Sequence, residues 1–161
     1  MRFSRNVRYI PFRDTGMALR HNQMTPLQGN PRQMQKEIVM ASILIVDDQP
    51  YIQDFFSHEL MDEGYKVVST GDAESVKVYL ETSKPDLVLL DLYLNGFEGW
   101  KLLNDIKHKD PLVPVFIVTA YDTYIDDPRV SRADGYFVKS FGHFDELKHK
   151  IANVLGQKHI E

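Results

Sequence analysis

The stretch that decides the fold is LVLLDLYLNGFEG, residues 87–99. Its four aliphatic residues end in a carboxylate, Asp91, and so apolar a run predicts a strand buried on both faces, as in a parallel sheet under helices. Asp91 then lies at the carboxyl end of its strand, where open α/β sheets bind ligands. The next helix is predicted to begin near Gly96 or Phe97, too far on for Asp91 to cap it directly. We therefore favour a chemical role for Asp91.

The composition limits the class of protein. The chain has 161 residues, of which 43% are hydrophobic, so it has room for one ordinary domain with a core. It contains no cysteine, which excludes disulfides, thiolate nucleophiles and cysteine metal sites and favours the reducing cytoplasm. No apolar run approaches the ~20 residues needed to cross a bilayer, so we expect no membrane span.

The charge is unevenly distributed along the chain. Residues 1–39 carry seven basic and two acidic residues, a balance of +5, whereas residues 40–161 have a balance of -9. The first segment also contains three prolines and no sustained periodicity. We expect residues 1–40 to be a disordered basic tail or an over-long start, and residues 41–158 to form the folded domain.

Strand and helix patterns alternate from residue 43 onward. Short apolar runs at 43–46, 65–69, 87–90, 113–118 and 136–138 are separated by segments with helical spacing. The last helix is predicted from about His143, with Gly156 just past its end. Asp127 and Pro128 indicate a cap and a first turn, so a helix between the fourth and fifth strands should be stunted or shifted. The pattern predicts a doubly wound, flavodoxin-like α/β fold: a five-stranded parallel sheet, order 2-1-3-4-5, with helices on both faces.

Polar residues follow the strands at one edge of this predicted sheet. They are Asp47, Asp48, Asp91, Thr119 and Lys139. Two carboxylates 4 Å apart repel by about 4 kcal/mol at an effective dielectric of 20, so a cation is expected between them. Magnesium fits best, because it prefers carboxylate oxygens, and the absence of histidine and cysteine at these strand ends argues against zinc.

The same residue types suit phosphoryl transfer. That reaction needs a nucleophile, here Asp91, and donors for the phosphoryl oxygens, here Lys139 and the Thr119 hydroxyl. Asp47 and Asp48 would hold the metal. Each residue alone has an ordinary structural explanation, but their joint arrival at successive strand ends is hard to obtain by accident.

With these residues the chain resembles the receiver domains of two-component response regulators, from residue 43 to about 155. The resemblance implies that Asp91 is the phosphoacceptor, followed by a short loop to Gly99. It implies that the acidic pair binds magnesium together with Asp91 and the backbone carbonyl of Tyr93. Thr119, which a small residue follows as in the family, and Tyr136, three residues before Lys139, match the switch residues.

Two positions depart from the family. Asn95 stands where a proline is usual four residues after the acceptor, and Ser140 stands where a proline usually follows the lysine. A cis peptide bond before a residue other than proline costs about 3 kcal/mol, so the isomer of the Lys139–Ser140 bond is left open.

We expect a stand-alone cytoplasmic receiver, because only one helix is predicted after Lys139 and the chain has no cysteine. It would take a phosphoryl group onto Asp91 from a histidine kinase or a histidine phosphotransfer protein, in a self-catalysed step rather than as a turnover enzyme. It would act on a separate output protein, with no attached DNA-binding domain.

Two alternatives stay open: a receiver-like binding module that is not phosphorylated, and a phosphatase with an aspartate nucleophile. Phosphatases of that type have a second aspartate where this chain has Tyr93. We also hypothesise that Tyr93 and Tyr121 obstruct the water that would hydrolyse the acyl phosphate, although simple packing is an equal alternative.

Overall fold

The computed structural model describes residues 40–95, 97–140 and 144–158. The expectations for residues 1–39 lie outside this part of the chain. Among the described residues, no helix has the length and apolar character that a bilayer crossing requires.

A parallel sheet of five strands forms the centre of the fold. It consists of β1 (Ser42–Val46), β2 (Lys66–Thr70), β3 (Leu87–Leu90), β6 (Val115–Thr119) and β7 (Gly135–Val138), in the order β2-β1-β3-β6-β7. The predicted order 2-1-3-4-5 is confirmed, because β4 and β5 pair only with each other. The register aligns Ile45 with Leu89, and Leu89 with Phe116, so the three central strands are side by side in the most buried layer.

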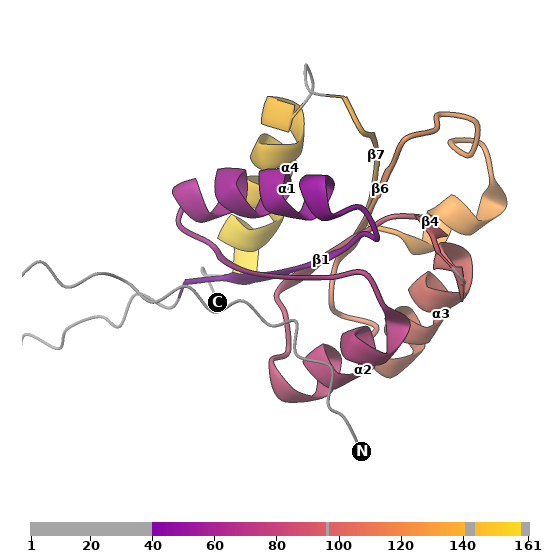
Figure 1. Cartoon of the computed structure of the whole chain (residues 1–161), viewed down its shortest axis with the longest axis horizontal. Coiled ribbons are helices and arrows are strands. Elements are labelled where there is room, and N and C mark those ends of the chain that lie inside the picture. Colours follow the sequence, from indigo (N-terminus) through magenta and orange to yellow (C-terminus); the bar gives the residue numbers. More distant parts are fainter. Residues whose placement is uncertain (1–39, 96, 141–143, 159–161) are drawn as a thin grey trace, which may run out of the picture. The chain divides into compact units, whose positions relative to one another are not determined.

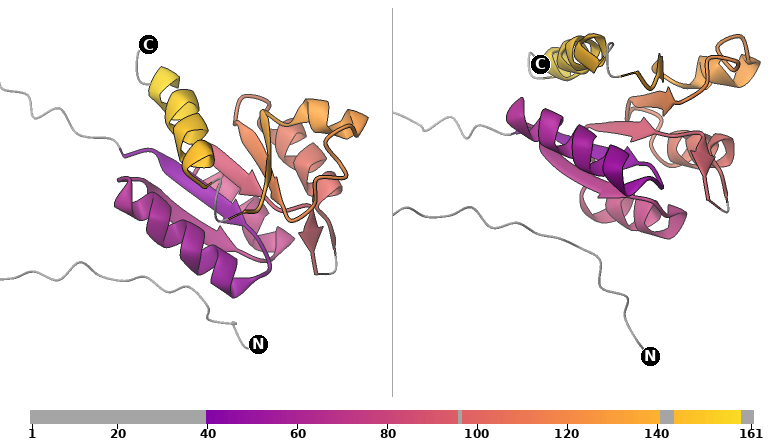
Figure 2. Two further views of the ribbon diagram at one scale, coloured as in Figure 1. Left: turned by 90° about the horizontal axis from the view of Figure 1, so that it is seen from above. Right: turned by 45° about the horizontal axis from the view of Figure 1, so that its top comes forward.

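Helices cover both faces of the sheet, as Figures 1 and 2 show. Alternate strand residues point to opposite faces, so each strand contributes to two cores. One core packs the sheet against α1 (Pro50–Asp62) and α4 (Phe144–Lys158), and includes Ile45, Leu89 and Phe116. The other packs it against α2 (Ala73–Thr82) and α3 (Gly99–Lys109), and includes Leu44, Val88 and Ile117.

Local sequence sets several helix boundaries. Pro50 occupies the first turn of α1, where its missing N–H costs nothing. Gly64 follows the helix with φ of 90°, a conformation that glycine adopts without strain. The Asp72 side chain accepts a hydrogen bond from the Ser75 backbone N–H and so caps the start of α2.

The segment after β3 differs from the prediction. The third helix was expected near Gly96 or Phe97, but α3 begins at Gly99. The residues before it form a small antiparallel hairpin, β4 (Tyr93–Leu94) with β5 (Phe97–Glu98), which occupies the backbone groups that a helix would need. Leu92 and Leu94 are buried, so the hairpin is anchored in the core on the α3 side.

Two further boundaries lie near the C-terminal end. The prediction that Gly156 lies beyond the last helix is wrong: α4 runs through it to Lys158, and Gly156 does not have the positive φ of a helix-ending glycine. The stunted fourth helix is confirmed. In its place is a short 3-10 helix, η1 (Pro128–Arg132), capped by the Asp127 side chain, which accepts from the Arg129 backbone N–H.

Candidate functional site

The backbone of the sheet brings the predicted site residues to one edge. The Asp47 N–H donates to the Thr70 carbonyl at 3.0 Å, which continues the β1–β2 ladder past the end of β1. The Asp91 N–H donates to the Val46 carbonyl at 2.9 Å. The Lys139 N–H donates to the Thr119 carbonyl at 2.7 Å. Adjacent strands therefore end in register, and their next residues meet at the C-terminal edge.

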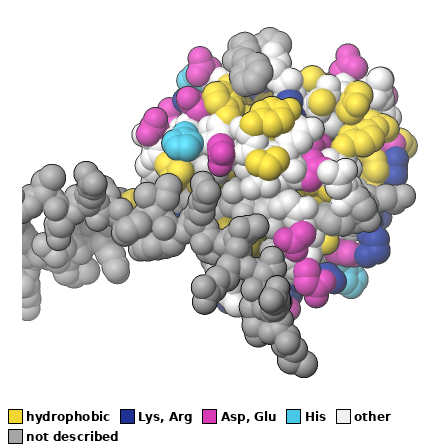
Figure 3. All heavy atoms as spheres, viewed as in Figure 1, with side chains coloured by type: hydrophobic (Ala, Val, Ile, Leu, Met, Phe, Trp, Pro, Cys, Tyr) yellow, Lys and Arg dark blue, Asp and Glu magenta, His cyan; other side chains and the backbone are white. Residues whose placement is uncertain are grey.

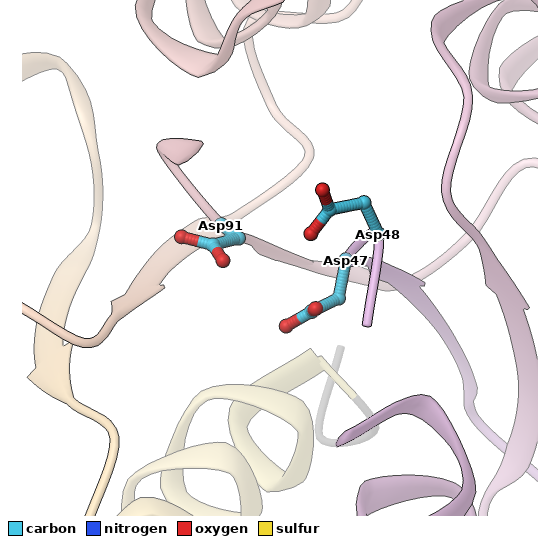
Figure 4. Close-up of side chains that lie close together, drawn as sticks. All are labelled: Asp47, Asp48 and Asp91. Atoms are coloured by element: carbon cyan, nitrogen blue, oxygen red, sulfur yellow. The ribbon is translucent and has the colours of Figure 1, made fainter. Parts of the chain in front are cut away.

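Asp47, Asp48 and Asp91 converge as the sequence predicts. Each offers a carboxylate oxygen, and these oxygens lie within 4.8 Å of one another. Figure 4 shows the three side chains grouped around a common space at the ends of β1 and β3. Asp47 and Asp91 are buried and Asp48 is half-buried. The site therefore has two carboxylates inside the fold and one at its mouth.

Backbone amides hold each carboxylate in place. Asp47 accepts from the Gln49 N–H at 2.9 Å, and Asp91 accepts from the Tyr93 N–H at 3.1 Å. Asp48 accepts from the Asn95 N–H at 3.0 Å. Asn95, which stands where the family usually has proline, thus supplies a donor that proline lacks.

Lys139 neutralises part of this negative charge. Its Nζ lies 2.6 Å from Asp47 Oδ2 and 2.6 Å from Asp91 Oδ2, and only 9% of its side chain is exposed. Burial alone would lower the pKa of Lys139, but hydrogen bonds and charge from the two carboxylates outweigh it and raise the pKa. Burial raises the pKa of Asp47 despite the lysine. The peptide bond that follows Lys139 is trans.

The hydroxyl of Thr119 has no hydrogen-bond partner. Thr119 is fully buried at the end of β6, and its Oγ1 is the buried side-chain polar atom left unsatisfied among the described residues. A buried hydroxyl without a partner is unfavourable by about 1–3 kcal/mol, so such groups often serve a ligand. This orphan donor suits an incoming phosphoryl oxygen.

The residues present fit a divalent cation. Three carboxylates around one ammonium leave the site negative, and all the side-chain donors are oxygens, which magnesium prefers. No histidine or cysteine belongs to the cluster found among the described residues, so the set does not favour zinc. The metal roles of the aspartates and of the Tyr93 carbonyl stay predictions.

Two supporting residues were missed by the sequence analysis. Gln53 donates from Nε2 to the Asp47 carbonyl at 2.5 Å, and Gly71 lies against the same backbone, since a Cβ there would be 3.2 Å from the Asp47 carbonyl oxygen. In the sequence Gln53 is an ordinary polar residue of a predicted helix, so no motif indicates its contact with Asp47. Gly71 follows a strand, where glycine commonly marks a close approach of two backbones.

Gly99 is the site glycine that the sequence did indicate. A Cβ at this position would lie 2.5 Å from both the Asp91 carbonyl oxygen and the Leu92 Cα. Its N–H also donates to the Leu92 carbonyl at 3.1 Å. The loop that carries Asp91 is therefore packed directly onto the first residue of α3.

A cluster of aromatic rings forms around Tyr93, two residues after Asp91. The Tyr93 ring centroid lies 4.8 Å from that of Tyr121 and 5.9 Å from that of Tyr124. The Tyr93 and Tyr124 hydroxyls are hydrogen-bonded, which raises the pKa of Tyr93 to about 12. The Tyr136 hydroxyl donates to the Tyr121 carbonyl at 2.5 Å. Tyr136, the predicted switch residue, is thus tied to the segment after β6.

Comparisons with known proteins identify the family of the chain. The sequence matches the response regulator receiver domain family over residues 43–152. It is 32% identical over 118 residues to the virulence transcriptional regulatory protein PhoP of Salmonella choleraesuis, covering 72% of this chain and 52% of that protein. It is 31% identical over 123 residues to the heme response regulator HssR of Staphylococcus aureus, covering 75% and 54%. The chain thus spans about half the length of these curated relatives.

Solved structures show the same fold. The response regulator TrrA of Thermotoga maritima, solved in complex with Mg2+ and BeF, is 36% identical with a TM-score of 0.68, and the match covers 71% of this chain and 99% of that one. TrrA was also solved in complex with the histidine kinase ThkA, where it aligns with a TM-score of 0.67 at 36% identity over 72% of this chain and 99% of that one.

Proposed function

Because the chain belongs to the response regulator receiver family, we propose that it accepts a phosphoryl group on Asp91 from a histidine kinase or a histidine phosphotransfer protein. The observation that carries the proposal is the convergence of three carboxylates with Lys139 at the C-terminal edge of the sheet. The structure of TrrA with a histidine kinase supports a donor of this class.

The side chains have complementary tasks in the transfer. A carboxylate oxygen of Asp91 attacks phosphorus, the P–N bond to the donor imidazole breaks, and the ring nitrogen keeps the electron pair. Lys139 and the Thr119 hydroxyl donate hydrogen bonds to phosphoryl oxygens as charge accumulates on them. Lys139 is already 2.6 Å from the acceptor carboxylate, so little rearrangement is needed.

Magnesium would be held by Asp47, Asp48, Asp91 and the Tyr93 carbonyl, and when bound it would neutralise charge on the phosphoryl oxygens. TrrA was solved with Mg2+ and BeF, which supports magnesium for this chain. Lys139 alone does not neutralise three carboxylates, and a bound cation would balance the remaining negative charge.

A pocket beside Lys139 offers a docking site for the donor protein. It has a volume of about 230 Å³ and lies between α1 and the end of β7. Tyr51, Ile52, Phe55 and Phe56 supply its apolar lining. An apolar side chain of the donor protein would fit this pocket while its phosphohistidine faces Asp91.

The proposed role ends with the phosphorylated domain rather than with released product. Asp91 carries the group itself until the acyl phosphate is hydrolysed, so the chain acts as a self-catalysed phosphoacceptor and not as a turnover enzyme. We propose that the output passes to a separate partner protein in the cytoplasm, where a chain without cysteine suits the reducing conditions.

Acetyl phosphate tests the proposal without a known kinase. With magnesium present, wild type should gain the mass of one phosphoryl group, whereas Asp91→Asn and wild type in EDTA should not. The exposed Asp145→Asn on α4 is the matched control and should label normally. No adduct on wild type would favour the binding module, and steady release of inorganic phosphate without an adduct would favour the phosphatase.

A further inference from the structure

An exposed apolar surface lies beside the phosphoacceptor loop. Tyr93, Tyr121 and Ile125 expose 47%, 51% and 61% of their area, and we call these three residues the β4–η1 surface. Figure 3 shows hydrophobic side chains gathered at the upper right, where the chain between β6 and η1 lies in Figure 1. Single exposed apolar residues are ordinary, but the exposed Tyr93 and Tyr121 rings contact each other, and contiguous exposed apolar area marks interaction sites.

Ring contacts and hydrogen bonds hold the tyrosine side chains of this surface in place. The Tyr93 and Tyr121 rings contact each other, and the Tyr136 hydroxyl fixes the Tyr121 carbonyl. Tyr124 is hydrogen-bonded to Tyr93 and packs its ring edge-on against Trp100 at 6.0 Å. Ordered aromatic side chains lose little conformational entropy on binding, so they serve well as contact residues.

The charge beside the surface is negative. Asp122 and Asp126 are exposed within residues 121–126, a segment without lysine or arginine. The next cation along the chain, Arg129, makes a bidentate ion pair with Asp127, at 2.9 Å from Nε and 2.8 Å from Nη2. It also lies over the Trp100 ring at 4.3 Å. Its charge is therefore already engaged, and the acidic residues set the local potential.

We propose that the β4–η1 surface docks a partner protein segment that presents one apolar side chain flanked by lysine or arginine. The apolar group would lie among Tyr93, Tyr121 and Ile125, and the flanking cations would face Asp122 and Asp126. Complementary charge of this kind selects the partner and speeds its association. The proposal goes beyond phosphoacceptor function and does not require it.

Trp100 provides the measurement, because it is the chain's single tryptophan and contacts Tyr124 beneath the surface. A tryptophan-free peptide with a central leucine between two pairs of lysines is titrated into the full chain while Trp100 fluorescence is followed. We expect saturable binding that weakens as salt is added. A matched peptide with glutamates in place of lysines should not bind.

Variants outside the phosphoryl site localise the binding. Ile125→Ser should weaken it about tenfold, as loss of an interface anchor does, and Asp122→Asn with Asp126→Asn should remove its salt dependence. Leu112→Ser, at an 86% exposed leucine elsewhere, is the control and should bind normally. Phosphorylation by acetyl phosphate should be the same in all of them, which separates this proposal from the function of Asp91.

Several results would overturn the proposal. Equal binding of the lysine and glutamate peptides, or equal weakening by Ile125→Ser and Leu112→Ser, would remove its basis. Sedimentation of a dimer that Ile125→Ser dissociates would assign the surface to a second copy.

Discussion

Lys139 is the residue on which the charge balance of the site depends. Its ammonium is shared between two buried carboxylates, Asp47 and Asp91, at 2.6 Å each. Removal of one partner from a buried ion pair typically costs 3–5 kcal/mol, because the remaining charge is left uncompensated. Lys139 therefore stabilises the folded protein by neutralising two buried carboxylates at this edge of the sheet.

Lys139→Met should lower the free energy of unfolding by about 3 kcal/mol in EDTA, measured by urea denaturation. Millimolar magnesium should recover more stability in the variant than in wild type, since the cation replaces the missing ammonium. Lys66→Met, at an exposed lysine on β2, is the control and should change neither value appreciably. A variant as stable as wild type without metal would contradict the charge argument.

The same ion pairs predict a pH dependence. The pKa of Lys139 is raised above its ordinary 10.5, so the folded state holds the proton more tightly than the unfolded state. The stability that Lys139 contributes is therefore complete below pH 10.5 and is lost as the pH rises through the raised pKa. The stability difference between wild type and Lys139→Met should stay constant from pH 8 to 10 and shrink only above that range.

Gly99 is the residue that fixes the position of the Asp91 loop. In Gly99→Ala the new Cβ would need the space of the Asp91 carbonyl oxygen, 2.5 Å away, so the loop must shift. We expect a loss of about 2 kcal/mol in unfolding free energy, as for other overpacked sites, with slower labelling by acetyl phosphate. Gly156→Ala is the matched control: nothing lies within 4 Å of its Cβ, and alanine should stabilise α4.

At the scale of elements, the strands were predictable and the connections were less so. Buried parallel strands are continuous aliphatic runs, so the sequence predicts strands at residues 43–46 and 87–90. The ends of these strands then give the positions of Asp47 and Asp91. The β4–β5 hairpin was not predicted, because two-residue strands leave almost no periodic pattern. The prediction for Gly156 was wrong because a glycine typically ends a helix where its φ is positive, and the sequence does not show the value of φ.

The element η1 was partly predictable, because Asp127 and Pro128 form a recognisable cap. Asp127→Ala should loosen η1, seen as faster hydrogen exchange of the Val130 and Ala133 amides, which bond within the turn. The Arg129 side chain lowers the pKa of Asp127 to about 2. Protection should therefore hold above pH 4 and fall as the pH drops from 4 towards 2, whereas Ser131→Ala should leave this pH profile unchanged.

At the scale of the whole molecule, distant segments meet in ways that sequence spacing only partly reveals. The topology alone predicts that Asp47, Asp91 and Lys139 converge, because parallel strand ends share one edge. It says nothing of which side chains cover that edge. Tyr93 comes from β4, whereas Tyr121 and Tyr124 come from the segment between β6 and η1, so their ring contacts depend on how the hairpin and that segment fold. Such contacts are set by loop geometry, which no periodicity encodes.

The position of Tyr93 and Tyr121 predicts a long lifetime for the phosphorylated protein. Tyr93 and Tyr121 lie two residues beyond Asp91 and Thr119, and their rings contact each other over the loop at 4.8 Å. Hydrolysis needs a water in line with the acyl phosphate, and we expect these rings to restrict its approach. The double variant Tyr93→Ala, Tyr121→Ala should therefore lose its phosphoryl group about tenfold faster, which corresponds to ~1.4 kcal/mol in the barrier.

The measurement is the decay of 32P-labelled protein after the phosphodonor is removed by gel filtration, with magnesium held constant. Tyr79→Ala, on α2 and outside the ring contacts of the site, controls for the loss of a tyrosine. If the double variant and wild type decay at the same rate, the tyrosines only pack over the loop and water reaches Asp91 by another path. A faster decay in the double variant alone would show that one cluster of rings sets the duration of the signal at Asp91.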